Sequence, residues 1–218
     1  MRLIGVYQNS GYEALADAAQ GFFERRTDLH RSGIAFASHS GEGSSGAVSQ
    51  APEPDKISTD ISLVWLDRSD PEAHALADVL MRGVSAGLKR YLAERPLFLE
   101  VCPERSLFVN PLFNLQRYRP GEGFRSWHCD WTTTEEATEP IRRVLAWILY
   151  LNSVPDGGTE FHWQDHHEEA ERGKLLIFPA SPSHTHRGRV SQEHTKTIAT
   201  GWINVGSLDA YVARLTEA

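Results

Sequence analysis

Cysteine and long apolar runs are both scarce in this sequence. Cys102 and Cys129 are its only cysteines, too few for a disulfide framework, so we expect a reducing, cytoplasmic setting. No window approaches the roughly 18 consecutive apolar residues that a membrane-spanning helix needs. The opening residues, MRLIGVYQNS, are too short and too polar to suggest a secretory signal.

An excess of positive charge is missing as well. The 22 Lys and Arg residues are outnumbered by 29 Asp and Glu residues, which gives a net charge of −7. That balance does not attract nucleic acid or an anionic membrane surface, so we expect neither as a partner. The sequence gives no indication of the oligomeric state. Histidine, by contrast, is plentiful: there are ten, and most lie between His128 and His194.

The first half of the chain has the pattern of helices with a little β-structure. Short strands are predicted at Arg2–Tyr7 and Ile61–Leu66. A first helix is expected to begin at the N-cap Ser10, with Glu13 as its capping-box partner, and to end near Arg25. These helices would support the second half of the chain.

A second, longer helix and a polar loop complete this half. Ser69 and Glu72 form another capping-box pattern, and apolar residues at four-residue intervals predict a helix that ends near Glu94. The segment Ser38–Asp55 is rich in Gly, Ser and Pro. It is typical of a disordered surface loop, or of a mobile lid that becomes ordered when substrate binds.

From Pro111 onward, short β-rich runs alternate with turn residues. This spacing favours an antiparallel sandwich or barrel. We therefore expect one domain over residues 1–218, with helical support over about 1–110 and a β core over about 111–206. The predicted strands are Phe113–Tyr118, Phe124–Trp131, Val144–Leu151, Thr159–Trp163, Lys174–Phe178 and Lys196–Val205.

A possible metal site lies in this β-rich half. In a strand, His128 and Asp130 point to the same face, where an imidazole and a carboxylate can converge on one ion. Trp127, Cys129 and Trp131 would point the other way and pack against the helices. A third ligand could come from His184 or His186 on a later strand. Two histidines and one carboxylate form the facial triad of non-haem iron(II) oxygenases.

Ordered blocks of sequence around these residues resemble the 2-oxoglutarate–Fe(II) oxygenase superfamily, in its prolyl-hydroxylase-like branch. The blocks are LQRYRPGEGFRSWHCD, VLAWILYLNSVPDGGTEF, GKLLIFPASPSHTHRG and KTIATGWIN, between about Asn114 and Asn204. The resemblance implies a mainly β fold with flanking N-terminal helices, a double-stranded β-helix (a cupin-like jelly roll). It also implies Fe(II), 2-oxoglutarate and O2 as cofactor and cosubstrates, with ascorbate as a reductant.

The resemblance also implies roles for particular residues. Lys196 takes the family's basic position and would pair with the distal carboxylate of 2-oxoglutarate. Tyr150 would donate to the same carboxylate, and Tyr118 and Thr200 would lie near the cofactor. His186 stands ten positions before Lys196, the family's spacing for the distal histidine, so the implied metal ligands are His128, Asp130 and His186.

The remaining polar residues near the site have open roles. His184 could line the pocket, and Arg187 could meet an acidic group on a substrate or a neighbouring loop. His166 and His167 fall in a polar stretch that we expect to be a solvated hairpin loop, although a second metal site there is conceivable. Specificity is expected from Ser38–Asp55, from Lys56–Asp60 and from an acidic rim at Trp131–Pro140, which would favour a cationic substrate.

The expected activity is hydroxylation of an aliphatic C–H bond with release of succinate and CO2. The substrate would be an amino acid, a peptidyl residue or a small metabolite. Asp130 favours hydroxylation over halogenation, because halogenating members of the superfamily lack this carboxylate. The alternative is a metal-binding cupin without oxygenase activity, either an isomerase or a binding protein.

Overall fold

The structure, a computed structural model, describes residues 3–35, 55–102, 106–131 and 143–217. The predicted loop Ser38–Asp55 lies outside the described residues except for Asp55. The acidic rim Trp131–Pro140 also lies outside them except for Trp131. The ideas of a mobile lid and of an acidic rim therefore stay predictions.

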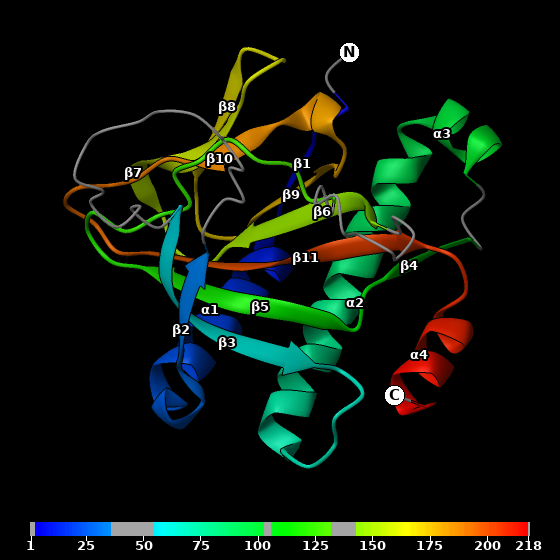
Figure 1. The fold of residues 1–218 in the computed structure, drawn as a ribbon, viewed down its shortest axis with the longest axis horizontal. Coiled ribbons are helices and arrows are strands. Elements are labelled where there is room, and N and C mark those ends of the chain that lie inside the picture. The colour runs from blue at the N-terminus through cyan, green and yellow to red at the C-terminus, as the bar shows by residue number, and fades with distance from the viewer. Residues whose placement is uncertain (1–2, 36–54, 103–105, 132–142, 218) are drawn as a thin grey trace, which may run out of the picture.

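Two long helices, α1 (Ser10–Arg25) and α2 (Pro71–Ala93), lie together behind a large β-sheet (Figure 1). Their apolar faces are buried, as the four-residue spacing of α2 predicts, and include Leu80 and Val84. The predicted helix ends near Arg25 and Glu94 are confirmed. Among the described residues, no helix combines the length and the apolar character needed to cross a membrane.

The predicted N-caps are wrong by one residue. The side chain of Asn9, not Ser10, accepts the backbone N–H of Tyr12. At α2 the cap is Asp70, which accepts the N–H of Ala73. Asn and Asp are cap formers as strong as Ser, so where two such residues are adjacent the pattern alone does not decide between them.

The large sheet is antiparallel, and in the described residues it has eight strands. Seven of them follow the order β1-β9-β6-β11-β5-β3-β2, and β4 pairs with the far end of β11. This order places β11 between β6 and β5, at the centre of the sheet. The strands are β1 (Gly5–Gln8), β2 (Arg31–Ala35), β3 (Lys56–Val64), β4 (Leu107–Val109), β5 (Leu112–Tyr118), β6 (Arg143–Tyr150), β9 (Lys174–Pro179) and β11 (Lys196–Val205).

A smaller sheet lies above the large one in Figure 1 and has the order β10-β7-β8 in the described chain. Its strands are β7 (Val154–Phe161), β8 (His166–Ala170) and β10 (His186–Gly188). The expectation of a loop at His166 and His167 is wrong, because both residues belong to β8 and pair with β7. The charged residues around His166 and His167 give this stretch the composition of a loop, although it forms a short strand.

Strand β6 explains how the two sheets share a core. Leu145, Trp147 and Leu149 face the helices and belong to the larger apolar cluster. Ile148 and Tyr150 face the small sheet, where a second cluster includes the β7 and β9 side chains. Burial on both faces is why β6 has a continuous apolar sequence without alternation. Two antiparallel sheets face to face with helices behind one of them form the predicted jelly roll.

Several elements depart from the prediction. The helices α3 (Pro96–Val101) and α4 (Leu208–Glu217) and the strands β2 and β4 were not anticipated. Short 3-10 turns also occur at Thr27–Leu29 and Pro182–His184. The most consequential difference is at Phe124–Trp131, which is not a strand.

Candidate active site

His128 and His186 meet through a single isolated β-bridge. Each backbone N–H donates to the other residue's carbonyl oxygen, at 3.0 and 2.9 Å. Four residues earlier, Phe124 makes another isolated bridge, to Lys56 on β3. The segment thus passes from the large sheet to the small one, and it cannot pair continuously with either. Sequence reasoning placed His128 and Asp130 on a regular strand, and that premise is wrong.

The outer side of this segment also differs from the prediction. Trp127 does not pack against the helices: the residue is 41% exposed, and the Arg187 guanidinium lies 4.3 Å from its ring centre. Arg187 also donates to Glu160 at 2.8 Å. Arg187 therefore contacts Glu160 of the small sheet and Trp127 of the segment that holds His128.

The two imidazole rings are held in a defined tautomer. Nδ1 of His128 lies 2.9 Å from the carbonyl oxygen of Ser126, and Nδ1 of His186 lies 3.0 Å from that of His184. A carbonyl oxygen can only accept, so each Nδ1 must carry the proton. In the neutral ring, Nε2 is then the nitrogen with the lone pair, which is the arrangement that a metal-binding histidine requires.

Asp130 lies next to these rings. Its Oδ2 is 3.6 Å from Nε2 of His186, and the rings of His128 and His186 are 4.4 Å apart at their centres. Within the described chain, no three His, Cys, Asp or Glu side chains already form a closed ligand set. The orientation of the two rings and the cavity that they share with Asp130 are what suit these three residues to a metal ion.

The electrostatics of His128 keep it neutral. Burial, reinforced by the neighbouring His186, lowers the pKa of His128 to about 4. Its ring also stacks on Phe124 at 3.7 Å with an interplanar angle of 7°. A neutral, stacked imidazole with a free Nε2 is suited to a cation, since no proton has to be displaced at neutral pH.

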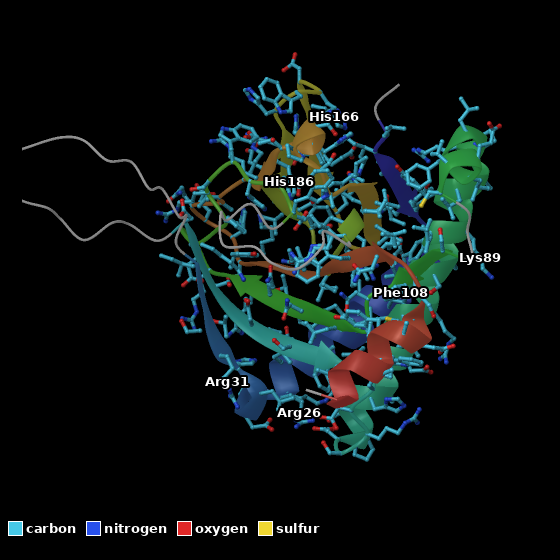
Figure 2. All side chains as sticks on the ribbon, turned by 45° about the vertical axis from the view of Figure 1, so that its right-hand side comes forward. Arg26, Arg31, Lys89, Phe108, His166 and His186 are labelled. Atoms are coloured by element: carbon cyan, nitrogen blue, oxygen red, sulfur yellow. The ribbon has the colours of Figure 1, made fainter. Side chains whose placement is uncertain are left out.

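All of the predicted site residues line one cavity of about 290 Å³ between the two sheets. Figure 2 shows His186 in the upper part of the molecule, far from Arg26 and Arg31 at the opposite end. The wall formed by β6 and β9 is apolar, whereas β3 and β5 contribute polar side chains. The lining includes His128, Asp130, His186, Tyr118, Tyr150, Lys196, Thr200, Lys56, Asn114, Gln116, Phe124, Ile148, Thr159, Phe178 and Trp202.

Lys196 is a buried cation in this cavity. Its side chain donates to the carbonyl oxygens of Gly157 at 2.6 Å and Arg189 at 2.8 Å. The described residues offer it no carboxylate, and burial lowers its pKa to about 8. An ammonium group has three N–H donors, so one remains for an anion that enters the cavity.

The three predicted cofactor-binding hydroxyl groups differ in whether their proton is free to be donated to a ligand. Tyr150 shares a hydrogen bond of 2.6 Å with Thr159, in which either oxygen can donate, so its proton can be directed to a ligand. Tyr118 donates to Gln116 at 2.7 Å, and Thr200 donates to the carbonyl of Trp147 at 2.9 Å. Both of these protons are already used. Burial raises the pKa of Tyr118 and of Tyr150, so both stay neutral.

Other histidines lie apart from this group. His184 is buried in the turn before β10, but it does not line the cavity, and its contribution is the backbone carbonyl that orients His186. His166 and His167 pair with Glu168 and Glu169. In the described chain they join no metal-binding group.

Sequence reasoning missed two groups in the cavity. Trp202 donates to Asp130 at 2.9 Å, and Gln116 links Tyr118 to Asp60. Lys56, within the stretch expected to govern specificity, lines the cavity and pairs with Asp60 at 2.6 Å. Alternation along β5 and β11 would have placed Gln116 and Trp202 on the same face as Tyr118 and Lys196.

Comparison with known proteins agrees with this geometry. The sequence model of the 2OG-Fe(II) oxygenase superfamily matches residues 113–204. No curated protein sequence matches the chain significantly.

Solved structures similar to the chain include three prolyl hydroxylases, which at these identities support the fold. The viral collagen prolyl hydroxylase of Paramecium Bursaria Chlorella virus-1, in its 2OG complex, has a TM-score of 0.61 at 13% identity over 94% of this chain and 97% of that one. A Pseudomonas putida prolyl-4-hydroxylase has a TM-score of 0.57 at 16% identity, with coverage of 93% and 92%. A Trichoplax adhaerens prolyl hydroxylase, in complex with a hypoxia inducible factor peptide fragment, has a TM-score of 0.55 at 10% identity, with coverage of 98% and 87%.

The matched region, 113–204, contains every predicted site residue. Over this region the chain is therefore similar to the 2OG-Fe(II) oxygenase superfamily, and its fold is like that of the solved prolyl hydroxylases.

Proposed function

We propose that the protein hydroxylates an aliphatic C–H bond, with His128, Asp130 and His186 as the iron ligands. The observation that carries this proposal is the orientation of the two imidazoles. Backbone carbonyls accept from both Nδ1–H groups, which leaves Nε2 of each ring as the nitrogen that can bind a metal ion, and both rings border the same cavity as the Asp130 carboxyl group. Two histidines and a carboxylate with open positions are the ligand set of non-haem iron(II) oxygenases.

The other end of the proposed site receives 2-oxoglutarate. Lys196 offers its third N–H, and Tyr150 can turn its hydroxyl away from Thr159, so both can donate to the distal carboxylate. Because its proton is held by Trp147, Thr200 acts only as an acceptor or as a wall of the cavity. The ring of Tyr118 lies 5.4 Å from Nζ of Lys196 and shields that charge from solvent.

The protein's contribution to the reaction is binding, orientation and exclusion of water. Bound Fe(II) supplies the oxidising chemistry that consumes 2-oxoglutarate and O2, with succinate and CO2 as the proposed coproducts. Phe124, Ile148 and Phe178 form apolar walls, which keep water away from a reactive centre. Asp130, as a carboxylate ligand, favours hydroxylation over halogenation.

The substrate is proposed as an amino acid, a peptidyl residue or a small metabolite. Two of the similar structures are of enzymes whose names refer to collagen or to a peptide fragment, which favours testing peptidyl substrates first. Lys56 and Asp60 are proposed specificity residues, because the Lys56 side chain enters the same cavity from β3. A cytoplasmic location also remains a prediction.

Succinate formation tests the proposal. Purified protein with Fe(II), ascorbate and 2-oxoglutarate is expected to form succinate only when O2 is present. His186→Ala should abolish it, because it removes one Nε2. His184→Ala is the matched control: it alters a neighbouring buried histidine but keeps the backbone carbonyl that orients His186, so turnover should persist.

The alternative, a metal-binding cupin without oxygenase activity, predicts a different outcome. Uncoupled turnover without substrate can be slow, so anaerobic titration provides a second measurement. If 2-oxoglutarate neither yields succinate nor perturbs the spectrum of the iron-loaded protein, the hydroxylase proposal fails and the isomerase or binding protein becomes the better explanation.

A further inference from the structure

The carboxylate of Asp130 is held by a side chain to which the sequence pattern gave no role. Trp202, on β11, donates its indole Nε1–H to Oδ1 of Asp130 at 2.9 Å. An indole nitrogen can only donate, so this contact fixes Oδ1 as the acceptor. The other oxygen, Oδ2, is the one that lies 3.6 Å from Nε2 of His186.

The backbone of Asp130 is fixed as well. Its N–H donates to the carbonyl of Ala180 at 3.0 Å. Its carbonyl oxygen accepts from Nη1 of Arg143 at 3.1 Å. With Trp202 these contacts come from β6, from β11 and from the residue after β9, so Asp130 is held although its own segment is not a strand.

Arg143 also acts on Trp202 directly. Its guanidinium lies 3.5 Å from the centre of the indole ring, a cation–π contact that holds the plane of the ring. One arginine thereby supports both the backbone of Asp130 and the donor to its side chain.

We propose that Trp202 is a positioning residue for Asp130. Its N–H occupies Oδ1 and leaves Oδ2 facing His186, so that Asp130 would bind a metal ion through one oxygen. Without this donor, the carboxylate can rotate about its terminal torsion, and the ligand set is less well prepared for a cation. The inference rests on the proposed function, because it takes Asp130 as a metal ligand.

Mn(II) affinity, measured by electron paramagnetic resonance of the free ion, tests this without turnover. Trp202→Phe is expected to weaken Mn(II) binding by about 10–100-fold, the usual effect of losing a partner that orients a metal ligand. Trp163→Phe is the matched control, since that indole donates to the carbonyl of Pro182 at 3.1 Å and does not line the cavity. It should bind Mn(II) as the wild type does.

A double-mutant cycle separates positioning from general damage. The effect of Trp202→Phe should disappear in an Asp130→Asn background, where no ionised carboxylate remains to be oriented. Wild-type Mn(II) affinity in Trp202→Phe, or an equal loss in the Asp130→Asn background, would overturn the proposal. If Asp130→Asn alone leaves Mn(II) affinity unchanged, the ligand assignment itself fails, and that result is distinct from the others.

A second variant covers the case in which Trp202→Phe does not fold. Arg143→Met removes the stacked cation and the contact to the Asp130 carbonyl but keeps the indole donor. It should weaken Mn(II) binding several-fold, less than Trp202→Phe, with the apo melting temperature measured beside it. An affinity equal to that of the wild type would contradict the supporting role of Arg143 and, with it, the proposed cluster.

Discussion

Replacing Lys196 by methionine is expected to weaken 2-oxoglutarate binding by at least about 100-fold. Removing one partner of a buried ion pair costs about 3–5 kcal/mol, and each 1.4 kcal/mol changes the affinity tenfold. Lys196 is only 5% exposed and has no carboxylate partner in the described chain. The distal carboxylate of 2-oxoglutarate would enter the same cavity. Methionine keeps the volume of the chain but leaves that carboxylate buried without a cation.

Lys174→Met provides a matched control for this experiment. Lys174 is also buried, and its ammonium also donates to a backbone carbonyl, that of Glu169 at 3.0 Å. It lies on β9 and does not line the cavity. Both variants should lose some stability, but only Lys196→Met should lose 2-oxoglutarate affinity, measured by anaerobic titration of metal-loaded protein. Equal affinities in the two variants would rule out Lys196 as the anion-binding group.

The pH dependence of 2-oxoglutarate binding follows from the same lysine. Burial lowers the pKa of Lys196 to about 8, so the cation is present below that pH and is lost above it. Affinity should therefore be flat near pH 7 and fall by up to about tenfold for each pH unit above 8, because one proton must be rebound. The fall should end once the pH passes the pKa of Lys196 in the complex, which the bound carboxylate raises.

A 2-oxoglutarate analogue in which the distal carboxylate is replaced by an amide separates deprotonation of Lys196 from ionisation of metal-bound water. It chelates through the same keto acid group but lacks the distal charge. Its weaker affinity should show no loss tied to a pKa near 8. If both compounds lose affinity in parallel, the titrating group is not Lys196.

Much of the site was predictable because it lies on regular strands. Lys196–Val205 was predicted with its observed bounds, and alternation then puts Lys196 and Thr200 on the cavity face. Tyr150 likewise follows from the run that precedes it, since β6 has Ile148 and Tyr150 on the same side. Strand periodicity carries such information because a shift of one residue would reverse every side chain.

The proposed metal-binding end was less predictable for a physical reason. Phe124–Trp131 has β-rich composition, yet it spans two sheets and makes only isolated bridges at Phe124 and His128. Local sequence reports preference for extended backbone but not which partner strand supplies the hydrogen bonds. The proximity of His128 to His186 came from the family resemblance, and the contact of Trp202 with Asp130 depends on packing across 72 residues.

Asp130→Asn is expected to lower succinate formation by at least about 100-fold, since losing even an outer partner of a metal ligand costs about 10–100-fold. Asparagine matches aspartate in size, and its amide oxygen can still accept from Trp202. The substitution therefore removes the negative charge of the proposed ligand while leaving its main protein contact in place. A neutral amide is a poorer ligand for a divalent cation than a carboxylate.

Cys129→Ser is the control for this variant. Cys129 is the adjacent residue and does not line the cavity. Its replacement therefore tests whether any substitution in this segment lowers activity. Oxygen-dependent succinate should persist in Cys129→Ser and fall in Asp130→Asn, and excess Fe(II) should restore part of the loss if weaker metal binding is the cause. Full turnover in Asp130→Asn at limiting Fe(II) would show that the ionised carboxylate is not needed. The metal ligands would then be only the two histidines, His128 and His186. Their Nδ1 atoms contact the backbone carbonyls of Ser126 and His184, which leaves each Nε2 for the metal.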